Sequence, residues 1–399
     1  MISNTSFPGV DLIYDEAMAA YRFGERHPMD PVRLRLTARL LRDLDVLGDG
    51  RGRVLHPYVA DDDQLRTVHS AAYVQAVRDA SGPDGEPDVS FGLGTEDDPI
   101  FPALHDASAR LFGGSLVAAE SVLEDKGRPA VNFGGGMHHA SRNKASGFCI
   151  YNDAAGAIAR LLDEGVSRVL YLDLDAHHGD GTQSIFWDDP RVMTISLHES
   201  GRTLFPGTGF AAENGGEDAP MTAVNVALPA GLQDGGWLRA FHAVVPQMAR
   251  AFEPEVIVSQ HGCDGHARDE QTNLKLTVDG MRQAALAVAD LAHDLTEGRW
   301  IATGGGGYDI IHTVPRVWSH LVAIASGKAL QISTPVPAPF REWVKERYGV
   351  DAPETMGDDV DLWWRSWEVG YDPGDPVDRA IMATRKELFP AFGLDPWFD

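Results

Sequence analysis

The sequence predicts a doubly wound α/β fold with a mostly parallel sheet flanked by helices. Short runs rich in valine, isoleucine and leucine recur along the chain, and their near-continuous apolar character is typical of strands buried on both faces. Longer stretches with helical apolar periodicity lie between many of these runs, and this alternation favours a parallel sheet. The chain has 399 residues, a length at which one large α/β domain is common even though roughly 150 residues per domain is usual.

The predicted elements alternate along the chain. The predicted strands occupy residues 129–133, 168–175, 192–197, 223–228, 255–260 and 300–304. The predicted helices occupy residues 29–47, 107–126, 152–165 and 280–298. The first helix opens with Asp30 and Pro31, a plausible N-cap and first helical position. Ligands of such folds bind beyond the carboxyl ends of the strands, so we expect the active site there.

A proline-rich segment, residues 331–339, predicts a boundary between a catalytic domain of residues 1–330 and an extension of residues 331–399. The extension holds five tryptophans: Trp343, Trp363, Trp364, Trp367 and Trp397. So many large aromatic residues argue against disorder. We therefore expect the extension to pack on the same domain.

The composition excludes several classes of protein. The formal net charge is −25, which disfavours binding to a nucleic-acid backbone and favours cationic partners. The two cysteines, Cys149 and Cys263, are too few for a disulfide scaffold or a cysteine-rich zinc module. The sequence predicts neither a signal peptide nor a membrane span. We expect a cytoplasmic protein with no membrane partner, and the sequence does not predict its oligomeric state.

The motif with the strongest chemical signal is LDLDAHHGDG, residues 172–181, at the end of a predicted strand. Asp175 and His177 are two residues apart, so their side chains point the same way along an extended strand end. A carboxylate oxygen and an imidazole nitrogen suit Zn²⁺ or Fe²⁺. The alternative is a solvated polar loop, but polar residues at a strand end in apolar surroundings are costly unless they bind something.

A second motif, NFGGGMHHA at residues 132–140, places two adjacent histidines after another predicted strand. His138 and His139 can act as an acid/base pair if each has its own carboxylate. Asp173 and Asp180 are natural partners. The alternative is one buried structural histidine beside an exposed one.

A third motif, VSQHGCDGHARD at residues 258–269, offers a further carboxylate. Asp264 follows a predicted strand and could complete a metal site. His261 and His266 are candidate ligands too, although a role as hydrogen-bonded neighbours is the simpler interpretation.

A fourth motif, TGGGGYDI at residues 303–310, presents Tyr308 after four glycines. A tyrosine hydroxyl in this setting can donate a hydrogen bond to a developing oxyanion. The alternatives are a tyrosine that only packs beneath the loop and a phosphate-binding loop, but the latter lacks the GxGxxG spacing and a following lysine.

Together these motifs resemble the metal-dependent deacetylase family that contains the histone deacetylases, and more closely its bacterial acetoin-utilisation branch. The resemblance covers most of the chain in order: residues 27–36, 94–101, 134–140, 145–153, 173–182, 196–198, 204–209, 260–266, 304–308 and 370–390. It implies an arginase/deacetylase-like fold and a hydrolase that acts on linear amide bonds.

The resemblance implies two metal sites. Asp175, His177 and Asp264 match the family's zinc ligands, with Fe²⁺ as an alternative metal. A buried potassium site is matched by Asp173, Asp175, His177, Ser196 and Leu197.

The resemblance also implies catalytic and substrate-binding roles. The matching catalytic residues are His138 and His139, paired with Asp173 and Asp180 respectively, and Tyr308. Phe148 and Phe205 match the aromatic walls of an acyl-lysine tunnel, with Gly147 beside them. Asp97 matches a rim aspartate that binds the substrate backbone, and Arg33 matches an arginine of an acetate-release channel. Gln271 departs from the family, which often has an apolar residue at this position of the tunnel rim.

The expected reaction is zinc-dependent hydrolysis of the acetyl amide of N-ε-acetyl-lysine in proteins, with acyl-CoA synthetases as plausible targets. A second enzymatic hypothesis is hydrolysis of small acylated amines such as acetylpolyamines, which the acidic segment Glu96-Asp97-Asp98 would suit. A metal-dependent binding protein without activity is the third. A two-metal, arginase-like hydrolase is disfavoured because Gly265 and His266 stand where further carboxylates are needed.

Overall fold

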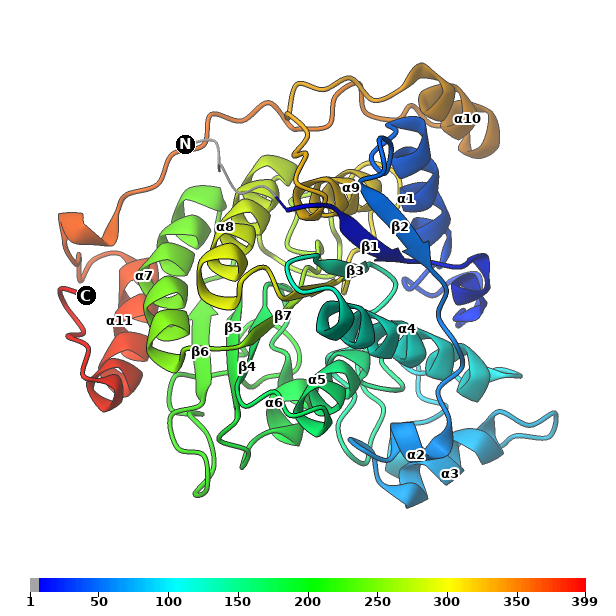
Figure 1. Cartoon of the computed structure of the whole chain (residues 1–399), viewed down its shortest axis with the longest axis horizontal. Coiled ribbons are helices and arrows are strands. Elements are labelled where there is room, and N and C mark those ends of the chain that lie inside the picture. The colour runs from blue at the N-terminus through cyan, green and yellow to red at the C-terminus, as the bar shows by residue number, and fades with distance from the viewer. Residues whose placement is uncertain (1–6) are drawn as a thin grey trace.

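A single sheet of eight strands lies at the centre of residues 7–399, the part of the chain that the structure, a computed structural model, describes (Figure 1). The strands are β1 (Val10–Ile13), β2 (Gly52–Leu55), β3 (Ala130–Asn132), β4 (Val169–Asp173), β5 (Val192–Glu199), β6 (Ala223–Leu228), β7 (Val256–Gln260) and β8 (Trp300–Thr303). Their order across the sheet is β2-β1-β3-β8-β7-β4-β5-β6, and every neighbouring pair is parallel. The predicted fold class is confirmed.

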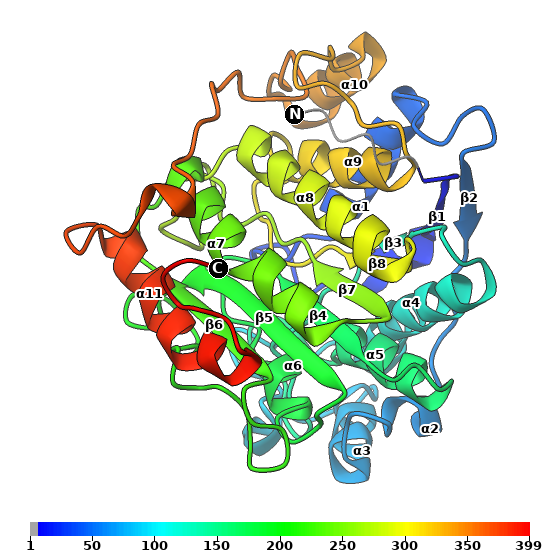
Figure 2. The ribbon, with the colours of Figure 1, turned by 60° about the vertical axis from the view of Figure 1, so that its left-hand side comes forward.

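Helices cover both faces of the sheet (Figure 2). One face is covered by α4 (Leu104–Glu124) and α5 (Asp153–Asp163), and the other by α7 (Asp234–Phe252), α8 (Val278–Thr296) and α9 (Val314–Ala325). The remaining helices are α1 (Val32–Asp43), α2 (Asp62–Leu65), α3 (Ala71–Ala80), α6 (Asp180–Ile185), α10 (Ala338–Tyr348) and α11 (Pro376–Leu388). Within residues 7–399, no helix has both the length and the apolar character needed to cross a membrane.

Six strands match predicted ones, and the two at the start of the chain, β1 and β2, do not. Each has only four residues. β1 contains the buried Asp11, which binds Arg53 and Ser121 and interrupts the apolar pattern. β2 is one of the two edge strands and is partly exposed. Short strands with these features give no clear periodic signal.

The end of β4 differs from the prediction. The strand stops at Asp173 rather than at Asp175. Beyond it, two backbone N–H groups donate to the carboxylate two residues earlier: that of Asp175 to Asp173, and that of His177 to Asp175. Such turns use aspartate side chains as local acceptors. Asp175 and His177 therefore lie on a turn and not on the extended strand that the sequence suggested.

Residues 331–399 contact the rest of the chain through several elements. Helix α11 packs against β6 and α7 (Figures 1 and 2). Arg239 of α7 donates to Asp378 of α11 at 2.8 Å. The tryptophans differ in burial: Trp367 is 7% exposed and Trp363 is 74% exposed. The division of the chain near residue 330 stays a prediction.

Candidate active site

The candidate active site is a cavity of about 190 Å³ beyond the carboxyl ends of β3, β4, β7 and β8. Its lining combines carboxylate, imidazole, aromatic and glycine residues from segments that are far apart in the sequence: Met29, Asp97, Gly136, Met137, His138, His139, Gly147, Phe148, Cys149, Asp175, His177, Leu204, Phe205, Gln271, Gly305, Gly306 and Tyr308. Because all strands are parallel, their carboxyl ends meet at one edge and bring these segments together.

Asp175, His177 and Asp264 form a cluster whose possible ligand atoms all lie within 4.8 Å of one another. His177 Nδ1 is 3.1 Å from Asp175 Oδ1 and 3.0 Å from Asp264 Oδ2. Both carboxylates are buried, at 1% and 0% exposure. Two buried carboxylates beside one imidazole nitrogen are a donor set that suits a divalent transition metal.

Neighbouring groups hold the two carboxylates of the cluster in place. Gln260 Nε2 and the backbone N–H of Gly306 donate to Asp175 Oδ2, at 2.7 and 2.9 Å. The backbone N–H of Ala176 donates to Asp264 Oδ1 at 3.1 Å. A side chain at Gly306 would collide with Asp264, so glycine is needed for this close approach.

Burial and mutual repulsion act on the carboxylates of the cluster. Burial, and then the charge of Asp175, raise the pKa of Asp264. Burial alone would also raise the pKa of Asp175, but the charges of His138 and His177 and the hydrogen bond from His177 hold it well below its usual range. The cluster therefore concentrates negative charge at a buried point, which favours a bound cation.

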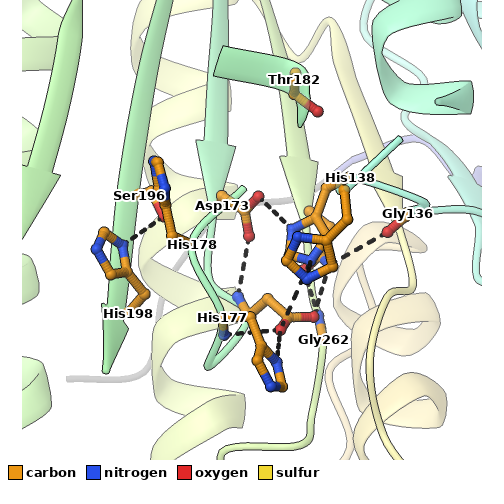
Figure 3. Close-up of polar contacts among 12 residues, drawn as sticks. Gly136, His138, Asp173, His177, His178, Thr182, Ser196, His198 and Gly262 are labelled. Carbon is orange, nitrogen blue, oxygen red and sulfur yellow. Dashed lines mark hydrogen bonds and ion pairs between the residues drawn. The ribbon is translucent and has the colours of Figure 1, made fainter. Parts of the chain in front are cut away.

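The tandem histidines lie beside this cluster, and each is paired with its own carboxylate. His138 faces Asp173 (Figure 3), and its Nδ1 is 2.8 Å from Asp173 Oδ2. His139 Nδ1 is 2.7 Å from Asp180 Oδ1. The two Nε2 atoms are 3.0 Å apart. Both histidines are buried, and both line the cavity. The alternative of one buried and one exposed histidine is wrong.

The two histidines have opposite pKa shifts. Burial lowers the pKa of His138, but the charges of Asp173 and Asp175 outweigh burial and raise it to about 9. Burial, and then the neighbouring charge of His138, lower the pKa of His139 to about 4. Near neutral pH the pair therefore holds one charged and one neutral imidazole.

Tyr308 lines the cavity from the glycine-rich loop that follows β8. Arg33 lies behind this loop, and its Nη1 donates to the carbonyl oxygens of Gly305 and Gly307 at 2.8 and 3.1 Å. Burial raises the pKa of Tyr308 well above its ordinary value, so the hydroxyl keeps its proton. Arg33 does not line the cavity, and its role at an acetate-release channel stays a prediction.

Two phenylalanines line the outer part of the cavity. The Phe148 ring meets Tyr308 edge-on at 5.7 Å, and the Phe205 ring meets His139 edge-on at 5.0 Å. Gly147 has a positive φ of 54°, and a Cβ there would lie 2.5 Å from the His139 ring. Only glycine therefore lets this loop approach His139.

Asp97 and Gln271 line the cavity too. The acidic segment that contains Asp97 is only partly at the surface: Glu96 and Asp97 are exposed, whereas Asp98 is 2% exposed. Burial, and then the charge of Asp97, raise the pKa of Asp98 to about 8. The interpretation of three acidic rim residues is therefore wrong for Asp98, whose side chain points inward.

The other residues of the predicted sites lie close by. Ser196 is the register partner of Asp173 (Figure 3), and Leu197 follows Ser196 on β5. His261 and His266 are outside the Asp175–His177–Asp264 cluster: His261 Nε2 is 2.8 Å from Ser259 Oγ, and His266 Nε2 is 3.0 Å from Asp358 Oδ2. Cys149 and Cys263 are buried and free.

Sequence reasoning missed three buried polar residues that hold the site. Gln260 binds Asp175. Asp153 accepts the N–H groups of Gly136 and Met137, at 3.0 and 2.8 Å, and so fixes the loop before the tandem histidines. Asp269 accepts the backbone N–H of Tyr308. All three lie in or near the sequence motifs, which was the one signal that could have pointed to them. Their hydrogen-bond partners are distant in the sequence and leave no local pattern.

Carboxylate-paired histidines beside a possible metal-binding group are the residue types that metal-assisted hydrolysis uses. Comparison with known proteins agrees. Residues 27–325 match the histone deacetylase domain. The chain is 39% identical over 383 residues to the acetoin utilization protein AcuC of Bacillus subtilis, covering 94% of this chain and 97% of that protein. A Staphylococcus aureus AcuC is 39% identical over 311 residues, covering 77% of this chain and 79% of that protein.

Solved structures are similar as well. A crystal structure of a histone deacetylase homologue complexed with SAHA superposes with a TM-score of 0.81 at 28% identity, covering 94% of this chain and 100% of that one. A homologue from Aquifex aeolicus superposes with a TM-score of 0.81 at 27% identity and the same coverage. The chain belongs to the histone deacetylase family, and it is a deacetylase, a hydrolase.

Proposed function

We propose that the protein hydrolyses the acetyl amide of N-ε-acetyl-lysine in proteins and that it depends on zinc. The observation that carries the proposal is the convergence of Asp175, His177 and Asp264 beside two carboxylate-paired histidines. Asp175, His177 and both of these histidines line one cavity. Acyl-CoA synthetases are plausible protein substrates by resemblance to the acetoin-utilisation branch.

The donor set fits zinc. Two carboxylates and one imidazole would hold the ion and leave coordination positions open, as catalytic zinc sites require. When bound, zinc supplies a Lewis acid that polarises the amide carbonyl and lowers the pKa of water. For potassium, Asp173, Asp175, His177, Ser196 and Leu197 form the proposed site, and the adjacency of β4 and β5 supports it.

The tandem histidines divide the proton chemistry between them. His139 is neutral near pH 7 because its pKa is lowered to about 4, so its Nε2 can accept the proton of the attacking water. It then returns this proton to the lysine amine as the amide C–N bond breaks. His138, with its pKa raised to about 9, stays charged between Asp173 and the cavity and stabilises developing negative charge.

Tyr308 completes the catalytic set. Its raised pKa keeps the hydroxyl protonated, so it can donate to the amide oxygen while negative charge develops there. Phe148 and Phe205 offer apolar ring surface to the methylene stem of the lysine. Asp97, exposed at the edge of the cavity, would accept hydrogen bonds from the substrate backbone.

A second candidate function, hydrolysis of small acetylated amines, is favoured by one observation. Glu96 and Asp97 are exposed next to the cavity, and among residues 7–399 no lysine or arginine side chain lines it. Cationic acetylpolyamines would be attracted by this charge. Because Asp98 is buried, two exposed carboxylates rather than three attract a cationic substrate, and the electrostatic support for this function is weaker than the sequence suggested.

Kinetics on a matched panel test the proposal. The panel pairs acetyl-lysine peptides of differing flanking sequence with acetylated polyamines, each assayed with and without a chelator. We expect higher kcat/KM on peptides and loss of activity with chelator. Higher kcat/KM on every acetylpolyamine than on every peptide would favour the second candidate.

A further inference from the structure

Asp269 is a buried carboxylate near the cavity to which the proposed chemistry gives no role. It lies on the segment between β7 and α8 and is 5% exposed. Its Oδ2 accepts the backbone N–H of Tyr308 at 2.8 Å, and its Oδ1 accepts the backbone N–H of Gln271 at 3.0 Å. One carboxylate therefore joins the glycine-rich loop to the outer rim of the cavity.

The loop before Tyr308 needs such an anchor. Its four glycines have no side chains to pack, and glycine gives the backbone the most conformational freedom. Other contacts hold only the glycines: Arg33 binds Gly305 and Gly307, and the N–H of Cys263 donates to Gly306 at 2.7 Å. Tyr308 itself is held differently: among residues 7–399, its backbone N–H donates to one acceptor, the Asp269 carboxylate.

We propose that Asp269 is a positioning residue: it holds Tyr308 so that the tyrosine hydroxyl lies within hydrogen-bonding distance of the bound amide oxygen. This inference rests on the proposed function, because it assumes that Tyr308 acts as the oxyanion donor. Within the described chain the Tyr308 hydroxyl makes no hydrogen bond, so its position is set by its backbone and by its edge-on contact with Phe148. A small shift of an oxyanion donor is costly because stabilisation needs a donor within about 3 Å of the oxyanion.

The same carboxylate fixes Gln271 at the cavity mouth. Removing it leaves two backbone N–H groups without their acceptor, one beside the oxyanion donor and one at the rim. Asparagine keeps one acceptor oxygen and nearly the same volume, so it should preserve one of the two bonds. The effects of Asp269→Ala and Asp269→Asn should therefore be graded.

A double-mutant cycle tests the proposal. Single-turnover rate and KM are measured on an acetyl-lysine peptide for the zinc-loaded protein, Asp269→Ala, Tyr308→Phe and the double variant, all with equal metal content. We expect Asp269→Ala to lower the chemical rate about 10-fold, with KM within about 2-fold, and Asp269→Asn to lie between. In the Tyr308→Phe background the same Asp269 substitution should change the rate less than about 2-fold.

Two further measurements separate positioning from loss of stability. Hydrogen exchange should rise in residues 304–309 of Asp269→Ala without a matching rise in β4. Asp234→Ala is a matched control, because Asp234 is also buried and accepts the N–H and hydroxyl of Thr277 at 3.0 and 2.7 Å, away from Tyr308. This control should lose thermal stability and keep the chemical rate.

The outcomes distinguish the inference from the function on which it rests. If the losses from Asp269→Ala and Tyr308→Phe add fully in the double variant, Asp269 does not act through Tyr308 and the positioning proposal is wrong. If Tyr308→Phe alone keeps the full chemical rate, the oxyanion assignment fails, and the positioning proposal fails with it.

Discussion

The floor and the rim of the cavity are built in different ways. The floor holds the Asp175–His177–Asp264 cluster and the tandem histidines, all buried or nearly so and carried by the segments that follow β3, β4 and β7. The rim holds Asp97, Phe205 and Gln271, which lie on loops and are more exposed. Phe205 is 43% exposed, whereas Asp264 is 0% exposed.

We infer that this difference separates the residues of the proposed chemistry from those of substrate choice. The floor carboxylates accept hydrogen bonds from Gln260 on β7 and from the backbone of Ala176 and Gly306, which follow β4 and β8, so their geometry depends on the fold. At the rim, Phe205 makes edge-on ring contacts with His139 and His177 instead of hydrogen bonds, and surface loops tolerate change more readily. We therefore expect floor substitutions to lower kcat and rim substitutions to change KM.

Among the substitutions considered, Asp264→Ala should lower catalytic activity the most. Removing one of two carboxylates from the cluster should abolish metal binding and lower activity on the order of 10³-fold or more. Metal content and kcat/KM are the measurements. Asp279→Ala, which removes a buried carboxylate away from the cavity, should retain the metal. A metal-replete, fully active Asp264→Ala protein would show that the cluster is not the catalytic metal site.

The next effect should come from His139→Ala. Loss of the general base should lower kcat by roughly 10²-fold or more. His138→Ala should be less severe, because His138 supplies charge rather than accepting the proton. Both variants should keep the metal, since neither residue belongs to the cluster. If both variants kept a near-wild-type kcat, the assignment of the two histidines as the acid/base pair would be wrong.

Tyr308→Phe removes one hydroxyl and keeps the ring. Loss of one oxyanion donor should lower kcat on the order of 10²-fold and leave substrate affinity nearly unchanged. Single-turnover rates and substrate affinity, measured on the same protein, separate the two effects. An unchanged chemical step with reduced thermal stability would mean that the tyrosine only packs beneath the loop.

The smallest effect should come from the rim. Phe205→Ala removes a half-exposed ring, so we expect KM for an acetyl-lysine peptide to rise about 3- to 10-fold with kcat within about 2-fold. Phe398→Ala is the control, because Phe398 is 87% exposed and does not line the cavity. A large fall in kcat without a change in KM would contradict the division between floor and rim.

The sequence predicted the residues of the cavity floor better than the buried residues that hold the site in place through hydrogen bonds. Asp175 and His177 are two residues apart, and His138 and His139 are adjacent, so each pair is visible in a local motif at a strand end. Asp98 looked like a rim residue because its burial depends on segments distant in the chain. Asp269 and Tyr308 are 39 residues apart, and no periodicity reports their hydrogen bond. Strands β1 and β2 were missed for a local reason, since four residues with a buried aspartate or an exposed edge give no strand pattern.

The central claim is that one metal ion in the Asp175–His177–Asp264 cluster is required for deacetylation. The most direct measurement is to strip the protein with a chelator, confirm that no metal remains, and titrate zinc back while following release of acetate from an acetyl-lysine peptide. We expect no activity in the metal-free protein and a linear return that reaches its maximum at one catalytic zinc per chain. Full activity in protein shown to be metal-free would contradict the account.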